Sequence, residues 1–193
     1  MPTVVVIPVK SFRLGKQRLA SALDDGQRSR LGRALATHVA ETVERAGLLA
    51  MFVTDDPQVA AWATSTGFPS LPDPGQGLNA AAAAGVAWAN QSKSRWIVLH
   101  SDLPLLHSED LRALAQPDGD VIAPSSDGGT SAISARRSIE FAFGPGSFHK
   151  HLARLDSPEI VTRRGFLLDV DSPADLASAL SHQRGRWMER ALA

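Results

Sequence analysis

Three aspartates follow apolar segments that have the composition of buried strands. Asp102 lies in the motif HSDLP, and Asp169 and Asp171 lie in the motif DVDSP. Residues two apart in extended backbone point to the same side, and ligands bind at the carboxyl ends of the strands in open α/β sheets. Two carboxylates about 4 Å apart repel by roughly 4 kcal/mol at an effective dielectric constant of about 20, and a hard divalent cation removes that repulsion. The pattern predicts a magnesium site formed by Asp102, Asp169 and Asp171.

A plainer interpretation applies to two of these aspartates. Asp102 and Asp171 each precede a predicted helix, and aspartate is a common helix N-cap. For one aspartate alone the cap is favoured. The occurrence of all three at strand ends, beside a basic loop, favours the metal site.

The basic loop, residues 10–18 (KSFRLGKQR), follows the first predicted strand. Its cations, Lys10, Arg13, Lys16 and Arg18, predict a site for a triphosphate. The alternative is an ordinary solvated loop. The segment matches neither GxxxxGK[ST] nor GxGxxG, so it is neither a P-loop nor a dinucleotide fingerprint.

The motif FGPGS is a second candidate for anion binding. Gly144 and Gly146 allow backbone to approach a ligand closely, and Ser147 begins a predicted helix, whose N-terminus attracts anions. The alternative is a Gly/Pro turn with a serine cap. His149 and His151 are two apart on that helix, a spacing that does not chelate a metal, and His100 receives no role.

Strand-like and helix-like segments alternate along the chain. The predicted strands are residues 3–9, 48–54, 95–100, 120–124, 130–135 and 166–170. The first predicted helix carries an apolar stripe of Leu31, Leu35, Val39 and Val43 and ends near Gly47. The other predicted helices are one from Pro57 to Gly67, an alanine-rich helix over 78–90, a short helix capped by Ser108, one starting at Ser147 and one starting at Ser172-Pro173. This order predicts an α/β three-layer sandwich with a mostly parallel sheet, in one domain over residues 1–193.

Composition excludes several classes of protein. Lys plus Arg and Asp plus Glu both number 20, without the basic excess typical of nucleic-acid-binding proteins. The chain has no cysteine, which excludes disulfides and thiolate chemistry and agrees with a cytoplasmic location. No apolar run approaches the ~20 residues of a membrane helix, and no signal peptide is recognised.

Several segments together resemble a known family. IPVKSFRLGKQRLA, GLNAAAAAG, HSDLPLL, DGGTSAI, FGPGSFHKH and LLDVDSPADL are similar, in this order and over nearly the whole chain, to the 2-phospho-L-lactate or phosphoenolpyruvate guanylyltransferases. The resemblance implies a nucleotidyltransferase fold of the glycosyltransferase-A type. It also implies transfer of GMP from GTP to a phosphorylated three-carbon acid, with release of diphosphate, in coenzyme F-420 biosynthesis.

The resemblance also implies roles for individual residues. Asp102, Asp169 and Asp171 correspond to the metal ligands, and Lys16, Arg18 and Asp102 to the catalytic set. The resemblance assigns binding of the acceptor acid to Thr130, Gly144 and Ser147. It assigns binding of the nucleotide to Lys10, Lys16, Arg18, Gly77 and Asn79. The chain departs from the family at Ser131, often Asn, and at Ser125, often an acid.

Alternatives stay open at this point. A molybdenum-cofactor or sugar nucleotidyltransferase has the same fold but typically begins with a segment similar to LAGGxSxRMG, where this chain has IPVKSFRLG. A nucleotide-binding regulator without turnover is a hypothesis of another class. The sequence does not choose among phosphoenolpyruvate, 2-phospho-L-lactate and 3-phospho-D-glycerate, between one and two metal ions, or between a monomer and a homodimer.

Overall fold

A seven-stranded sheet forms the centre of the computed structural model, which describes residues 3–193. The strands lie in the order β3-β2-β1-β4-β6-β5-β7. Their bounds are β1 Thr3–Pro8, β2 Leu49–Thr54, β3 Ser70–Pro72, β4 Arg95–Leu99, β5 Val121–Pro124, β6 Thr130–Ser134 and β7 Glu159–Ile160. All neighbours pair in parallel except β6, which runs antiparallel to β4 and β5. The mostly parallel sheet is confirmed, with one reversed strand among the described residues.

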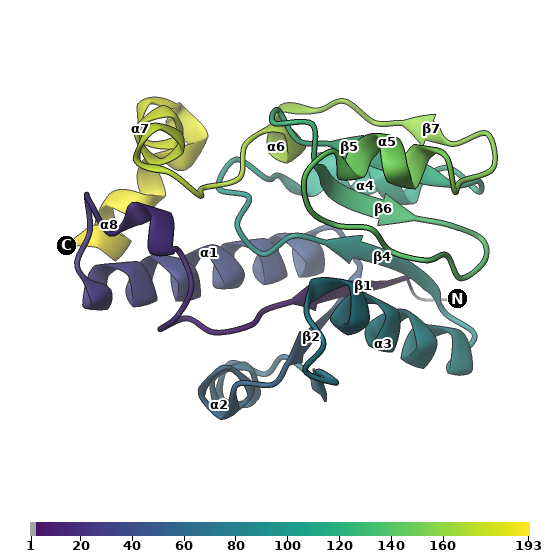
Figure 1. The fold of residues 1–193 in the computed structure, drawn as a ribbon, viewed down its shortest axis with the longest axis horizontal. Helices are drawn as coiled ribbons and strands as arrows, with labels where there is room; N and C mark the ends of the chain where they lie inside the picture. Colours follow the sequence, from purple (N-terminus) through teal and green to yellow (C-terminus); the bar gives the residue numbers. More distant parts are fainter. Residues whose placement is uncertain (1–2) are drawn as a thin grey trace.

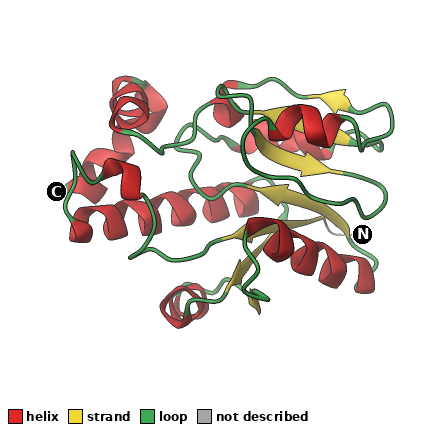
Figure 2. Ribbon diagram, viewed as in Figure 1, coloured by secondary structure: helices red, strands yellow, loops and turns green. Residues whose placement is uncertain are grey.

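Helices cover both faces of the sheet (Figures 1 and 2). They are α1 Asp25–Arg45, α2 Pro57–Ser65, α3 Leu78–Gln91, α4 Ser108–Ala115, α5 Ser147–Leu152, α6 Arg164–Leu167, α7 Pro173–Ser181 and α8 Glu189–Leu192, with 3-10 helices η1 Gln17–Leu19 and η2 Gln183–Met188. The helices α1, α2 and α4 share one core cluster with the sheet, and α3 and α5 share the other. The α/β sandwich is therefore confirmed.

The first strand shows why the sheet is buried on both faces. Val5 packs in the cluster that contains Val39 of α1, while Val6 packs in the cluster that contains Val86 of α3. A Cβ atom at Gly85 would collide with the side chain of Val6, so α3 approaches the sheet at its small residues. The alanine-rich run is thus a closely packed helix, and one turn of it requires glycine.

The predicted strand over residues 166–170 is wrong. Phe166 belongs to the short helix α6, and irregular backbone follows it. Three backbone groups there find partners in other segments. The Ser131 hydroxyl donates to the Phe166 carbonyl, the Ser126 N–H donates to the Leu167 carbonyl, and the Val170 N–H donates to the Asp102 carbonyl. Residues 166–170 are mostly apolar because the segment is packed into the protein. An apolar run alone does not distinguish a buried strand from a buried irregular connection.

Helix caps were predicted with mixed success. Ser172 caps α7 with Pro173 in the first turn, as expected. The cap of α4 is His107 rather than Ser108, because the His107 ring accepts the Glu109 N–H while the His107 N–H donates to a carboxylate in the first turn. An imidazole nitrogen with a lone pair serves here in place of a hydroxyl.

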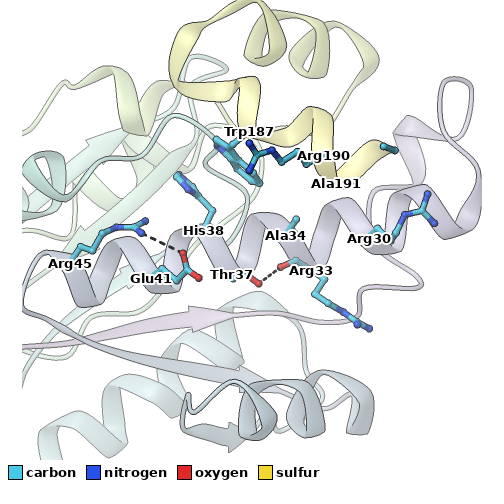
Figure 3. Close-up of a pocket in the computed structure, with 11 residues that line it drawn as sticks. Arg30, Arg33, Ala34, Thr37, His38, Glu41, Arg45, Trp187, Arg190 and Ala191 are labelled. Atoms are coloured by element: carbon cyan, nitrogen blue, oxygen red, sulfur yellow. Dashed lines mark hydrogen bonds and ion pairs between the residues drawn. The ribbon is translucent and has the colours of Figure 1, made fainter.

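The helix α1 extends past the sheet and holds the C-terminal segment. Leu31 and Leu35 pack with Val170, Leu176 and Met188 in a third core cluster. Further along α1, His38 stacks on Trp187 (Figure 3), with ring centroids 4.6 Å apart. The His38 Nε2 lies 3.1 Å from the Leu106 carbonyl. Among residues 3–193 no helix is both long and apolar enough to cross a membrane.

His38 generates a prediction about stability. Burial lowers the pKa of His38 to about 4, from an ordinary 6.5. The unfolded chain binds this proton more readily than the folded chain, so the free energy of unfolding falls as the pH drops from 6.5 towards about 4. The substitution His38→Gln keeps a donor for the Leu106 carbonyl and does not titrate. We expect His38→Gln to have a lower free energy of unfolding than the wild type at neutral pH. This difference, measured by urea unfolding, should become smaller as the pH falls through the same range. The exposed His149→Gln is the control, and an unchanged difference at every pH would contradict the assignment.

Candidate active site

Three separate segments meet at the carboxyl ends of the central strands. Lys16 comes from the loop after β1, Asp102 follows β4, and Asp171 lies between α6 and α7. The Lys16 Nζ lies 2.5 Å from Asp102 Oδ2 and 2.9 Å from Asp171 Oδ1. The structure therefore brings two of the predicted metal ligands to a single ammonium group.

The buried pair of Lys16 and Asp102 stays charged at neutral pH. Burial is the largest influence on the pKa of Lys16 and lowers it, but the charges of Asp102 and Asp171 outweigh it and leave this pKa raised. Burial likewise raises the pKa of Asp102, but the Lys16 ammonium outweighs it and leaves this pKa below 3.8. Each charge thus depends on the other for compensation.

Asp169 completes the acidic group. Burial and then the charge of Asp102 raise the pKa of Asp169 to about 6, and the charges of Asp171 and Asp127 add to the shift. Each neighbouring negative charge disfavours ionisation of this carboxyl. One lysine does not balance three carboxylates, so the site favours an additional cation.

The oxygen atoms of the acidic group also suit a hard cation. Asp102 Oδ1 is buried and has no hydrogen-bond partner among residues 3–193. A bare, buried carboxylate oxygen is the type of ligand that magnesium takes. The described residues hold no ready-made cluster of three or more His, Asp or Glu ligands, and the Lys16 ammonium pairs with two of the three carboxylates.

The alternative role of Asp102 and Asp171 as helix caps is not supported. The caps of α4 and α7 are His107 and Ser172, and the Asp171 N–H donates to Asp175 in the first turn of α7. Neither aspartate accepts a hydrogen bond from the first turn of a helix among the described residues. Their carboxylates face Lys16 instead.

The loop after β1 positions Lys16 with strained backbone. Lys16 has a φ of 56°, in the left-handed region, and begins η1. A side chain at the preceding Gly15 would collide with the Ser11 carbonyl, which explains the glycine. Strain of this kind costs of order 1–3 kcal/mol and is concentrated at functional sites.

The other predicted nucleotide residues lie at different places. Lys10 lies between two cavities, of about 180 Å³ next to Lys16 and about 280 Å³ next to Gly77. Arg18 is exposed on η1, and its side chain makes no ion pair or hydrogen bond with residues 3–193. The structure thus brings Lys10 and Lys16 together at the first of these cavities, and Arg18 stays a prediction.

The cavity next to Gly77 has glycines at its mouth and acids on its wall. Gly75 and Gly77 have φ values of 77° and 88°, and Asp55 and Asp73 contribute carboxylates. Asn79 does not line this cavity. Its Oδ1 accepts the Phe143 N–H at 2.7 Å, so it joins the start of α3 to the loop that precedes Gly144.

Thr130 and Ser147, predicted to bind the acceptor, lie side by side. Both are buried, and their hydroxyl oxygens are 3.4 Å apart. Gly144 and Gly146 have φ values of 122° and 67°, so the turn needs glycine at both positions. The Ser147 N–H already donates to the Gly144 carbonyl at 3.0 Å, which leaves the hydroxyls as the available polar groups of this pair.

Two further residues were not predicted. His151 is fully buried, with Nδ1 3.0 Å from Thr130 Oγ1 and Nε2 2.8 Å from the Ala142 N–H. His100 Nε2 is buried without a partner among the described residues. Ser147 and His151 are four residues apart on α5, so they lie on the same face of that helix. This spacing is the only signal in the sequence that could have placed His151 near Thr130.

The departures at Ser125 and Ser131 have structural roles. The Ser125 hydroxyl donates to the Asp127 carboxylate and, with the Gly129 N–H, lowers the pKa of Asp127. The Ser131 hydroxyl holds the Phe166 carbonyl at the start of the connection to Asp169. Both serines therefore organise loops next to the acidic group.

The sequence as a whole matches a known family. Residues 3–192 match the model described as guanylyl transferase CofC like. The chain belongs to this family. A phosphoenolpyruvate guanylyltransferase of Sphaerobacter thermophilus is 33% identical over 94% of this chain and 94% of its own length. One from Rubrobacter xylanophilus is 35% identical over 92% and 93%. A 2-phospho-L-lactate guanylyltransferase of Methanothermobacter thermautotrophicus is 30% identical over 96% and 87%.

Solved structures agree with a CofC-like fold. A Desulfovibrio desulfuricans protein described as a nucleotide-diphospho-sugar transferase has a TM-score of 0.74 at 16% identity, covering 100% of this chain and 97% of its own. A nucleotidyl transferase from Methanothermobacter has a TM-score of 0.63 at 13% identity, covering 98% and 99%. The manganese complex of Rv0371c from Mycobacterium tuberculosis has a TM-score of 0.58 at 16% identity, covering 94% and 99%. These structures show the nucleotidyltransferase fold. The family match and the named relatives show that the chain is an enzyme, which disfavours a non-catalytic regulator.

The acidic group generates a prediction for the CofC-like enzyme. We expect Asp171→Asn to lower kcat/KM by at least about a hundredfold, because it removes a carboxylate from the cation site. The melting temperature should change little, since the Asp171 side chain is 48% exposed and Lys16 keeps its ion pair with Asp102. Asp118→Asn, on an exposed loop, is the control. Full metal-dependent turnover would show that Asp171 is not a ligand, and a large loss of melting temperature without metal would indicate a structural role.

Proposed function

We propose that this enzyme transfers GMP from GTP to the phosphate of phosphoenolpyruvate and releases diphosphate, as a step of coenzyme F-420 biosynthesis. The observation that carries the proposal is the match to CofC-like guanylyltransferases over residues 3–192. The choice of acid is supported by the names of the relatives: two named for phosphoenolpyruvate are 33% and 35% identical to this chain, and two named for 2-phospho-L-lactate are 30% and 32% identical.

The proposed reaction needs no general base. An oxygen of the acid's phosphate, already anionic near neutral pH, forms a bond to the α-phosphorus of GTP. The bond from that phosphorus to the bridging oxygen of the β-phosphate breaks, and its electron pair leaves with diphosphate. Catalysis then depends on alignment of the two substrates and on neutralisation of the charge that collects on diphosphate.

The residues divide this work among them. Asp102, Asp169 and Asp171 would hold magnesium, which would supply positive charge beside the phosphates. Lys16 and Lys10, at the cavity next to β1, neutralise the triphosphate, with Arg18 as a further contact. Thr130 and Ser147 bind the acid through their hydroxyls, while Gly144 keeps the space beside them open.

The cavity next to Gly77 suits guanine. Asp55 and Asp73 contribute acceptor oxygens to its wall. Guanine offers N–H donors on its Watson–Crick edge, at N1 and the 2-amino group, where adenine has an acceptor and a bare carbon. A site built to accept hydrogen bonds discriminates strongly against a base that leaves its acceptors unpaired.

The related enzyme class, a molybdenum-cofactor or sugar nucleotidyltransferase, is disfavoured by the start of the chain. Pro8, Val9 and Lys10 replace the glycines of those enzymes, and all three line both cavities. Their side chains occupy part of the space that a glycine-rich loop leaves open.

A substrate panel tests the proposed function directly. We expect diphosphate release with GTP and phosphoenolpyruvate, and a kcat/KM at least about a hundredfold lower with ATP. The nucleotides GTP, ATP and CTP are each combined with phosphoenolpyruvate, 2-phospho-L-lactate and 3-phospho-D-glycerate. Equal turnover with ATP would refute the guanine site, and a preference for 2-phospho-L-lactate would change the acceptor while keeping the reaction.

Ser147 provides a test of the acceptor site. A hydrogen bond to a charged group contributes roughly 1.5–3 kcal/mol, so Ser147→Ala should raise the KM of the acid by about one to two decades. The KM of GTP should change little, because the triphosphate is assigned to the Lys16 loop. Ser126→Ala, on an exposed loop, is the control. A selective loss of GTP affinity would show that the two pockets are reversed.

A further inference from the structure

His151 on α5 contacts Thr130 on β6. It is fully buried, and its ring packs edge-on against Phe143 at 4.7 Å between centroids and against Phe141 at 6.2 Å. Its two ring nitrogens face different partners. Nε2 lies 2.8 Å from the Ala142 backbone nitrogen, and Nδ1 lies 3.0 Å from Thr130 Oγ1.

The partner of Nε2 determines the tautomer. A backbone N–H only donates, so Nε2 must accept and carries no hydrogen. The proton of the neutral ring is therefore on Nδ1, which donates to Thr130 Oγ1. Burial, with the charges of Arg154, His100 and Lys150, lowers the pKa of His151 to about 4, so the neutral ring persists at neutral pH.

The tautomer in turn decides what Thr130 can do. Its oxygen accepts from His151 and lies 3.4 Å from the Ser147 hydroxyl oxygen. Because the Nδ1–H of His151 is directed at a lone pair of Thr130 Oγ1, the hydrogen of the Thr130 hydroxyl points away from the ring and is available to a third partner. A hydroxyl held as a donor in this way is suited to a phosphate or carboxylate oxygen, which only accepts.

We propose that His151 is a positioning residue, which orients the Thr130 hydroxyl as a donor to the anionic acceptor acid. This inference rests on the proposed assignment of Thr130 to the acid. His151 itself touches no substrate, and it acts through its Nδ1–H and through the rigid seat that the Ala142 N–H and the two phenylalanine rings provide. The hydrogen bond from Thr130 is stronger to an anionic oxygen than to a neutral hydroxyl oxygen, so the same geometry favours an anionic acceptor.

A matched pair of substitutions separates the two functions of the ring. The side-chain nitrogen of asparagine falls near the position of Nδ1, so His151→Asn keeps the donor to Thr130 and loses the link to Ala142. Glutamine reaches the position of Nε2, so His151→Gln keeps the link and loses the donor. We expect His151→Gln to raise the KM of phosphoenolpyruvate about tenfold with the KM of GTP unchanged, and His151→Asn to raise it far less. His149→Gln, exposed on the same helix, is the control.

A double-mutant cycle with Thr130→Val tests whether the effect passes through Thr130. Thr130→Val alone should raise the KM of the acid about ten- to a hundredfold, and His151→Gln should add nothing in that background. Independent, multiplying effects would overturn the positioning role, as would a loss shared equally by GTP. If Thr130→Val leaves the KM of the acid unchanged, Thr130 is not part of the acceptor site, and the proposed role of His151 is refuted as well. If only the His151 variants lack an effect, the acceptor site stands and the positioning role is refuted.

The tautomer can be read in the unmodified enzyme, which keeps the proposal testable if the variants fail to fold. Nitrogen-15 NMR of the histidine rings should show His151 protonated at Nδ1 near neutral pH, with and without phosphoenolpyruvate. Protonation at Nε2 would contradict the hydrogen bonds described here and overturn the proposal.

Discussion

The ion pairs of Lys16 connect the parts of the site. Its ammonium contacts Asp102 and Asp171, so it joins the loop after β1, the end of β4 and the connection before α7. Without that ammonium, Asp102 would be a buried carboxylate with a second oxygen already lacking a partner. The rest of the site depends on this compensation, because burial and then the same carboxylates raise the pKa of Asp169 and favour a further cation.

Much of this arrangement could be predicted from the sequence. The positions of Asp102 and Lys16 followed from the rule that polar residues after parallel strands share one edge, and the burial of β1 followed from its β-branched run. Asp169 and Asp171 were placed correctly near Asp102 for a wrong reason, since they follow an irregular connection rather than a strand. His151 could not be found in this way, because its role depends on which ring nitrogen meets a backbone N–H, and that is a property of the folded packing.

The reversed strand β6 explains how two kinds of chemistry share one edge. Residues that begin a parallel strand lie at the edge opposite the site. Because β6 runs antiparallel to β4 and β5, its first residue, Thr130, pairs with Pro124 at the carboxyl end of β5. Thr130 thereby lies at the same edge as Asp102, and the helix α5 brings Ser147 and His151 against it.

The two halves of the site differ in sequence separation, which has a consequence for folding. Thr130 meets Ser147 and His151 across 17 and 21 residues, whereas Lys16 meets Asp102 and Asp171 across 86 and 155. Contacts between distant residues must overcome a larger loop-closure entropy before they contribute stability. The half that holds Thr130 is therefore encoded within one short stretch of chain, and the carboxylate half exists only when the entire chain has folded. Displacement of the C-terminal segment would separate Asp171 from Lys16, whereas the contacts of Thr130 with Ser147 and His151 do not include that segment.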